Sequence, residues 1–137
     1  MSHEKKKRPH SLNGTTVKLK VGCGNLHLTL NYNDEYKLIE VMSQLGKSGS
    51  CFRSQTDALS RVISIALDHG ASLNEIISVL EDIHCPTPSI DHGIKILSCP
   101  DAFAKAFKNF EEYIKDHKSK KDKGTSKGGT DNGNSGK

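Results

Sequence analysis

The chain has 137 residues, of which 34% are hydrophobic and 26% are charged, and its formal net charge is +4. This size fits one small domain with unstructured ends. The sequence contains no apolar run of about 18 residues, which argues against a membrane-spanning helix. Its charged N-terminus lacks the apolar stretch that follows in a secretory signal. We therefore expect a cytoplasmic protein with no membrane partner.

The positive charge is confined to the two ends of the chain. Residues 1–8 carry a net charge of +3 and residues 118–137 carry +4, whereas residues 9–117 carry −3. Basic tails of this kind keep a protein soluble or touch nucleic acid weakly through Lys. Nucleic acid is therefore not expected as a main partner, except weakly through the Lys-rich tails.

Composition also predicts the domain boundaries. Residues 118–137 are rich in Lys, Gly, Ser and Asn and hold almost no apolar side chain that could offset the entropy of ordering. We predict a flexible N-terminus at 1–9, a folded domain at 10–117 and a disordered tail at 118–137.

The first half of the domain reads as a sheet. Residues 15–21 and 26–30 alternate apolar and polar side chains across a Gly-rich turn at 22–25, the pattern of a β-hairpin. Residues 38–42 form a third, shorter apolar run. We predict an antiparallel meander of about three strands.

The second half changes to helical spacing. The first predicted helix ends at Gly70, and its apolar residues are Ala58, Leu59, Val62, Ile63, Ala66 and Leu67. Ser72 and Glu75 form a capping box that starts a second helix. Residues 95–97 make a short extended piece. The predicted fold class is therefore α+β, with a small antiparallel sheet followed by three helices.

The third helix is expected to begin at Ser98 or Cys99, with Pro100 in its first turn and Asp101 near the positive end of the helix dipole. The apolar stripe of this helix comprises Ala102, Phe103, Ala106, Phe107, Phe110, Tyr113 and Ile114.

Four cysteines stand in short Gly- or Pro-containing motifs, and we take them as the candidate site: Cys23, Cys51, Cys85 and Cys99. In a reducing compartment such cysteines favour metal or thiolate chemistry over disulfides. Cys51 and Cys99 lie at helix starts, which lower the pKa of a thiol. Four thiolates around one ion form a structural zinc site or hold an iron–sulfur cluster.

Two other interpretations stay open, one of the cysteines and one of a neighbouring histidine. Because the sequence holds no Cys-x-x-Cys pair, the cysteines can also be read as small buried hydrophobic residues. His84, beside Cys85, is an alternative ligand or a thiolate partner, or else an exposed loop residue.

A short loop before the first helix is a second candidate site, with the residues Gly46, Lys47, Ser48, Gly49 and Ser50. Position 41 is Val, whereas a phosphate loop requires Gly there, so nucleoside-triphosphate hydrolysis is not expected. Backbone amides at a helix start can still bind an anion. The competing interpretation is that the glycines bend the backbone around Cys51.

Several of these motifs together resemble a known family. The run Leu97-Ser98-Cys99-Pro100-Asp101 resembles the hallmark that names the TSCPD domain, with Leu97 where that name has Thr. Three further motifs resemble the cysteine motifs of this domain in vitamin B12-dependent (class II) ribonucleotide reductases, at residues 22–26, 46–52 and 84–88. The resemblance covers about residues 8–107.

The resemblance implies a function linked to deoxyribonucleotide synthesis. In that family the domain is a C-terminal extension of the reductase or a small separate protein, and its four cysteines match those of this chain. A chain of this length has no room for the reductase barrel, so cobalamin is not expected here and catalysis by the chain alone is doubtful.

We therefore expect a non-catalytic accessory or regulatory module that binds zinc, or alternatively an iron–sulfur cluster, and that docks on a ribonucleotide reductase catalytic subunit or a related protein. Two alternatives are a thiol redox relay, with Cys51 or Cys99 as the reactive thiolate, and an iron–sulfur or metal carrier scaffold.

Overall fold

The computed structural model describes residues 9–45 and 51–131, with side chains through Ser119. The predicted anion-binding loop at 46–50 lies outside the described residues. Within the described ranges, no helix is both long enough and apolar enough to span a bilayer.

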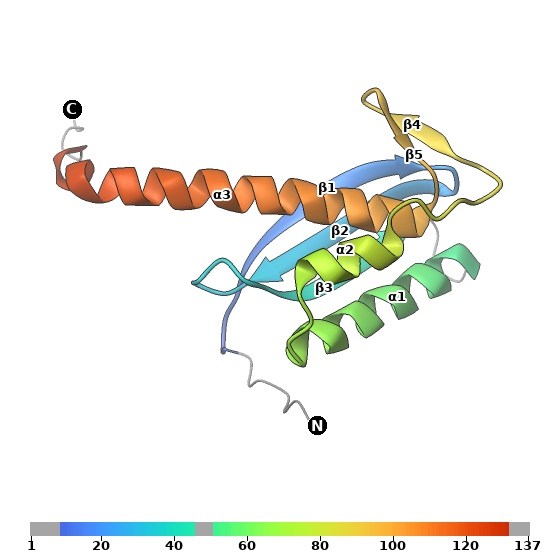
Figure 1. Cartoon of the computed structure of the whole chain (residues 1–137), viewed down its shortest axis with the longest axis horizontal. Coiled ribbons are helices and arrows are strands. Elements are labelled where there is room, and N and C mark those ends of the chain that lie inside the picture. The colour runs from blue at the N-terminus through green and yellow to red at the C-terminus, as the bar shows by residue number, and fades with distance from the viewer. Residues whose placement is uncertain (1–8, 46–50, 132–137) are drawn as a thin grey trace. The chain divides into compact units, whose positions relative to one another are not determined.

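Three strands form the predicted antiparallel meander (Figure 1). They are β1 (Asn13–Val21), β2 (Gly24–Tyr32) and β3 (Leu38–Leu45), in the order β1-β2-β3. Val21 pairs with Gly24, so the hairpin turn consists of only Gly22 and Cys23. This tight turn holds the first cysteine at one end of the sheet.

One face of this sheet belongs to the core. Its buried side chains alternate along the strands, and they include Leu26, Leu28, Leu30, Val41 and Leu45. Burying each such side chain contributes roughly 1.5–3 kcal/mol. On the opposite face, Lys18 pairs with His27 and His27 with Gln44, and all three are exposed. The sheet is therefore covered on one side, as its alternation predicts.

Helix α1 (Cys51–Asp68) forms where predicted, and its buried face coincides only in part with the predicted apolar stripe. Ile63 and Leu67 are buried, whereas Val62 is 62% exposed. Ser60 and Ser64 face the core instead, and their hydroxyls donate to the carbonyls of Thr56 and Val41. Because these hydroxyls find backbone acceptors, small polar residues can occupy the core face.

Helix α2 (Leu73–Leu80) begins at the predicted cap. The Ser72 side chain accepts a hydrogen bond from the Glu75 backbone N–H at 3.1 Å. A small hairpin follows, made of β4 (Ser89–Asp91) and β5 (Ile94–Ile96). Only β5 was expected, because residues 89–91 carry no alternating run long enough to predict a strand.

The hairpin lies against the end of β1 through side-chain contacts. The Ser89 hydroxyl donates to the Lys20 carbonyl at 2.7 Å, and the Lys20 backbone N–H donates to the Asp91 carboxylate at 3.2 Å. These two bonds give the backbone N–H and C=O of Lys20 hydrogen-bond partners in the hairpin.

Helix α3 (Cys99–Asp131) starts at the predicted residue. Its predicted stripe is buried at Ala102, Phe103, Ala106, Phe107, Phe110 and Ile114. The chain divides into two compact units at residues 1–107 and 108–137, and α3 runs across their border.

Helix α3 is long, and the predicted boundary at Lys118 stays a prediction. It stays helical through Asp131, past the predicted start of a disordered tail at Lys118. Lys is a good helix former, so a helix that has already begun can continue through a Lys-rich stretch without tertiary contacts. Residues 132–137 lie outside the described residues.

Candidate functional site

The four cysteines lie in four separate places. Cys23 is in the β1–β2 turn, Cys85 is between α2 and β4, and Cys99 is the first residue of α3. These three are half-buried. Cys51 is the first residue of α1 and is exposed. All four are free thiols in this structure.

Three of the four thiols converge. The pKa of Cys99 is raised to about 11. Burial is the largest cause, followed by the charge and hydrogen bond of Cys23 and then by the charge of Cys85. Cys51 is not among the groups that act on Cys99. Segments far apart in the sequence therefore bring Cys23 and Cys85 within electrostatic reach of Cys99.

The raised pKa corrects one expectation. The start of a helix favours a thiolate, so we predicted a lowered pKa for Cys99. Two effects outweigh the helix dipole. Burial disfavours the charged thiolate of Cys99, and the neighbouring thiols of Cys23 and Cys85 disfavour a further negative charge beside them. In the metal-free protein Cys99 is thus a protonated thiol at neutral pH.

The thiols of Cys23, Cys85 and Cys99 do not have the arrangement of metal ligands in this structure. Among residues 9–45 and 51–131, no group of three or more His, Cys, Asp or Glu side chains is arranged to hold a metal ion. The donor chemistry nevertheless fits a thiophilic cation, because such an ion would offset the repulsion that raises the pKa of Cys99.

A close backbone contact fixes the turn that carries Cys23. Gly22 lies so near Thr87 that a Cβ atom on it would come within 1.8 Å of the Thr87 carbonyl oxygen. Only glycine allows this approach. The Thr87 hydroxyl also lies 3.8 Å from the Cys85 sulfur. The same contact therefore places the Cys85 segment against the Cys23 turn.

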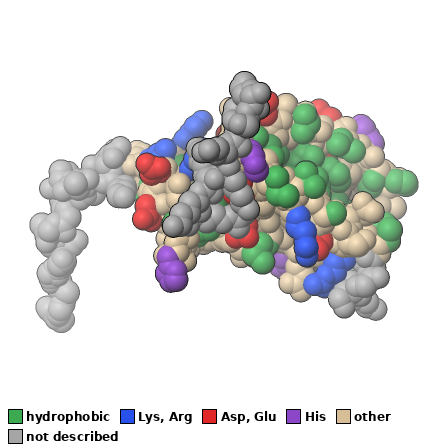
Figure 2. All heavy atoms as spheres, turned by 90° about the horizontal axis from the view of Figure 1, so that it is seen from below, with side chains coloured by type: hydrophobic (Ala, Val, Ile, Leu, Met, Phe, Trp, Pro, Cys, Tyr) green, Lys and Arg blue, Asp and Glu red, His purple; other side chains and the backbone are tan. Residues whose placement is uncertain are grey.

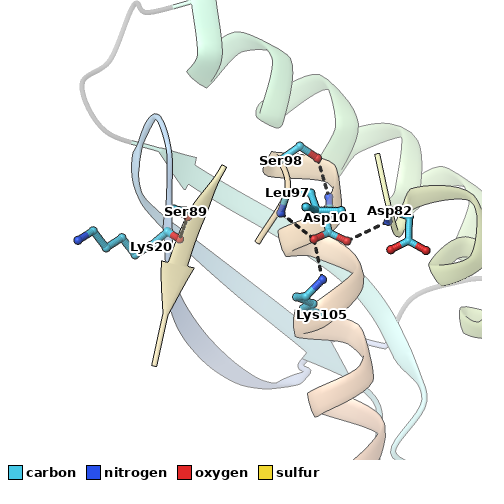
Figure 3. A network of polar contacts seen from close by, with 7 residues as sticks. All are labelled: Lys20, Asp82, Ser89, Leu97, Ser98, Asp101 and Lys105. Carbon is cyan, nitrogen blue, oxygen red and sulfur yellow. Dashed lines mark hydrogen bonds and ion pairs between the residues drawn. The ribbon is translucent and has the colours of Figure 1, made fainter. Parts of the chain in front are cut away.

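A buried carboxylate joins the Cys85 segment to α3 (Figure 3). Asp101 is fully buried, and it accepts hydrogen bonds from the backbone N–H of Asp82 at 3.0 Å and of Leu97 at 2.9 Å. The Lys105 ammonium donates a third bond at 2.6 Å. One side chain thus ties the end of α2 and the residue after β5 to the first turn of α3.

Two further bonds complete this connection. The Ser98 hydroxyl accepts from the Asp101 backbone N–H at 3.1 Å, which caps α3. The Cys85 backbone N–H donates to the Leu97 carbonyl at 3.1 Å. The backbone of Cys85 is therefore bonded to Leu97, which lies two residues before Cys99.

Asp101 is ionised in this setting. Burial alone raises its pKa, but the bonds from Leu97, Lys105 and Asp82 together outweigh burial and hold the pKa below its ordinary value. The carboxylate therefore acts as a charged structural anchor at neutral pH. The Ser-x-x-Asp signature predicts its position at the helix start, whereas nothing in the sequence predicts its bond to Asp82.

Two further predictions concern His84 and the loop at 46–50. His84 is exposed, which agrees with its interpretation as a loop residue. The loop at 46–50, which precedes Cys51, is not described. A cavity of about 460 Å³ is lined by Lys20, Pro88, Ser89, Ile90 and Lys95 and includes no cysteine.

Comparison with known proteins identifies the family. No curated protein and no solved structure matches the chain. The sequence model of the TSCPD domain matches residues 3–111, which span β1 to β5 and the first turns of α3. This match includes all four cysteines and the Asp101 anchor. The chain therefore belongs to the TSCPD domain family.

Proposed function

We propose that this protein is a non-catalytic accessory module that acts with a ribonucleotide reductase and is built around a four-cysteine zinc site. The observation that carries the proposal is the convergence of Cys23, Cys85 and Cys99 from three segments. These segments are joined by the Gly22–Thr87 contact and the Asp101 anchor.

The proposed ligands are Cys23, Cys85 and Cys99, with Cys51 as the fourth. Cys51 is exposed at the start of α1, directly after the Gly-rich segment 46–50. A bound zinc ion would supply a positive charge and covalent cross-links between distant segments, so that binding energy becomes folding energy. The protein's own part is to hold the thiols together and to bury Cys99.

Elemental analysis of protein purified without added metal tests the zinc site. We expect about one zinc per chain, and loss of the metal when any one of the four cysteines is replaced by Ser. Visible absorbance with bound iron would support the iron–sulfur alternative in place of zinc. Stably folded protein with no metal and four freely titrating thiols would contradict both.

The proposed link to a reductase is supported by membership of the TSCPD family together with the resemblance of the motifs to reductase sequences, and it needs its own test. We expect the protein to co-purify with a ribonucleotide reductase from its native cell and to change the rate or allosteric response of that enzyme. The chain alone is expected to reduce no ribonucleotide. If it affects no reductase while its zinc site is intact, the partner proposal fails and the metal proposal stands.

The exposure of Cys51 favours a second candidate function, a thiol redox relay. An exposed thiol is accessible to the disulfide or thiol of a partner protein. Cys99 does not suit that role, because its pKa of about 11 leaves little thiolate at neutral pH. Rapid alkylation of Cys51 in zinc-loaded protein would favour the relay, whereas protection by zinc would favour the metal site.

A further inference from the structure

The β4–β5 hairpin forms one wall of a cavity that the proposed metal site does not use. The cavity measures about 460 Å³, which is in the size range of small-molecule sites. Pro88 and Ile90 line it, and Ile90 is 66% exposed. The exposed Val62 and Ile65 belong instead to α1, on the side of the molecule seen in Figure 2, and they do not line this cavity. The hairpin therefore presents exposed apolar surface in a concave setting.

Two lysines from different strands line the same cavity. Lys95 on β5 lies directly opposite Ile90 on β4, so the side chains of this pair share one face of the hairpin. Lys20 reaches the cavity from β1. Because the stem of a lysine is apolar and its ammonium stays in water, the two side chains extend the apolar wall and add positive charge at its edge. The cavity is therefore suited to a ligand with an apolar body and an anionic group.

The charges of these two lysines are not neutralised by the described part of the chain. Among residues 9–45 and 51–119, no carboxylate lies within ion-pair distance of the ammonium of Lys20 or Lys95. Asp91 is the acidic residue of the hairpin, and it does not line the cavity. Its carboxylate accepts from the Lys20 backbone N–H at 3.2 Å and lies 3.0 Å from the ring of His92. Both ammonium groups are therefore left for a ligand.

Backbone bonds hold Lys20 against the hairpin before any ligand binds. The Ser89 hydroxyl donates to the Lys20 carbonyl (Figure 3), and the Asp91 carboxylate accepts from the Lys20 N–H. These bonds use only the main chain of Lys20, so its ammonium stays unused. Because the strand and the hairpin are already joined, a ligand would lose little affinity to ordering of the cavity.

We propose that this cavity binds a phosphate monoester that carries a flat organic ring, such as a nucleoside monophosphate. A phosphate monoester has a charge of about −1.5 to −2 at pH 7, which two ammonium groups match better than they match the single charge of a carboxylate. A bare phosphate ion would leave the wall of Pro88 and Ile90 without a contact, whereas a ring packs against it. The proposal does not rest on the zinc site, because no cysteine lines the cavity.

Calorimetric titration of the full chain with adenosine 5′-monophosphate tests this site. We expect saturable binding of one molecule per chain, with a dissociation constant of about 0.1–1 mM at low salt. Adenosine and inorganic phosphate each lack one half of the ligand, so each should bind at least about tenfold more weakly. Absence of saturable binding, or binding of inorganic phosphate as tight as that of the nucleotide, would overturn the proposal.

Lysine variants test the anionic half of the site. Lys20→Ala and Lys95→Ala should each weaken binding of the nucleotide by about tenfold. Their melting curves should not change, because the bonds of Lys20 to the hairpin use its backbone. Lys18→Ala is the matched control, since Lys18 is exposed two residues earlier on β1 and does not line the cavity. An equal effect of Lys18→Ala would show that binding depends on overall charge and not on this cavity.

Isoleucine variants test the apolar half. Ile90→Ser removes apolar surface from the wall and should weaken binding of the nucleotide by about fivefold. Ile94→Ser is the matched control, because Ile94 is 52% exposed on the same hairpin and does not line the cavity. If both variants bind the nucleotide as wild type does, the ring does not contact this wall and the proposal fails.

Discussion

The carboxylate of Asp101 accepts a hydrogen bond from the backbone N–H of Asp82, 19 positions earlier in the chain. Asp82 adopts a left-handed φ of 66°, a conformation that Asp tolerates better than most residues, and α2 ends two residues before it. The end of α2 and the start of α3 are thereby fixed to each other, and Cys85 and Cys99 are held by this one connection.

Replacing Asp101 by Asn should destabilise the fold strongly. The neutral amide loses the charge-assisted bond from Lys105 and cannot accept as well from both backbone donors. We expect a loss of about 2–4 kcal/mol in the free energy of unfolding, measured with urea. The exposed Asp34→Asn is the matched control, and its effect should stay within about 0.5 kcal/mol. Equal effects of the two variants would contradict the anchor role.

The contribution of Asp101 should also depend on pH. Its pKa is lower in the folded protein than in the unfolded chain, so its stabilising effect is fully present above the unfolded pKa of about 3.9 and is lost as pH falls through the folded value. In chelator-treated protein, the stability difference between wild type and Asp101→Asn should be constant from neutral pH to about pH 5 and should shrink below about pH 4. A difference that does not vary down to pH 2 would refute this assignment.

Replacing Gly22 by Ala should separate Cys23 from Cys85. The added methyl group would collide with the Thr87 backbone carbonyl, which cannot move without its whole segment. We expect both a lower melting temperature and a reduced zinc content. Gly14→Ala in β1 is the control, because the one close contact of its methyl group would be with the Asn31 side-chain amide, which can rotate away. Unchanged zinc binding in Gly22→Ala would show that this contact does not position the cysteines.

Alkylation of the metal-free protein should rank the cysteines. Exposed Cys51 should react fastest, and Cys99 slowest, because a pKa of about 11 leaves roughly one thiol in a thousand ionised at pH 8. Mass spectrometry of partly labelled protein gives the order. Rapid labelling of Cys99 would contradict its raised pKa and the convergence of thiols that causes it.

Truncation after His117 tests the predicted domain boundary. The removed residues hold almost no apolar side chain, so the melting temperature should change by no more than about 2 °C. A control that ends after Lys105 removes buried Phe107 and Phe110 and should fail to fold. Strong hydrogen-exchange protection beyond Lys118 would show that the far end of α3 contributes to stability.

The sequence predicted which helices and strands form better than it predicted which of their side chains are buried. Local alternation predicted the hairpin and the third strand, and the capping box at Ser72 predicted the start of α2. On α1, periodicity predicted the buried Ile63 and Leu67 correctly but included the exposed Val62. It missed Ser60 and Ser64, which are buried and bond to backbone carbonyls. Hydropathy alone cannot anticipate such a bond, since its acceptor at Val41 lies on another element.

The sequence predicted which residues belong to the candidate site, but it did not predict where they lie relative to one another. The motifs identified all four cysteines, but the convergence of Cys23, Cys85 and Cys99 depends on contacts across the fold. One of these contacts, between Gly22 and Thr87, joins positions 65 residues apart, and no local pattern encodes it. Cys51 borders the segment 46–50, and its place as a fourth ligand stays a prediction.

The dependence of the Cys85 segment on Asp101 also sets an order of events during synthesis. The hairpin that carries Cys23 can form as soon as β2 has left the ribosome, because its contacts are local. The loop with Cys85 can contact the Cys23 turn earlier, through Gly22 and Thr87, but its anchor to α3 forms only when the first turn of α3 emerges and Asp101 reaches Asp82 and Leu97. The three thiols therefore meet only when translation has passed the first turn of α3, so the proposed metal site would be complete only then.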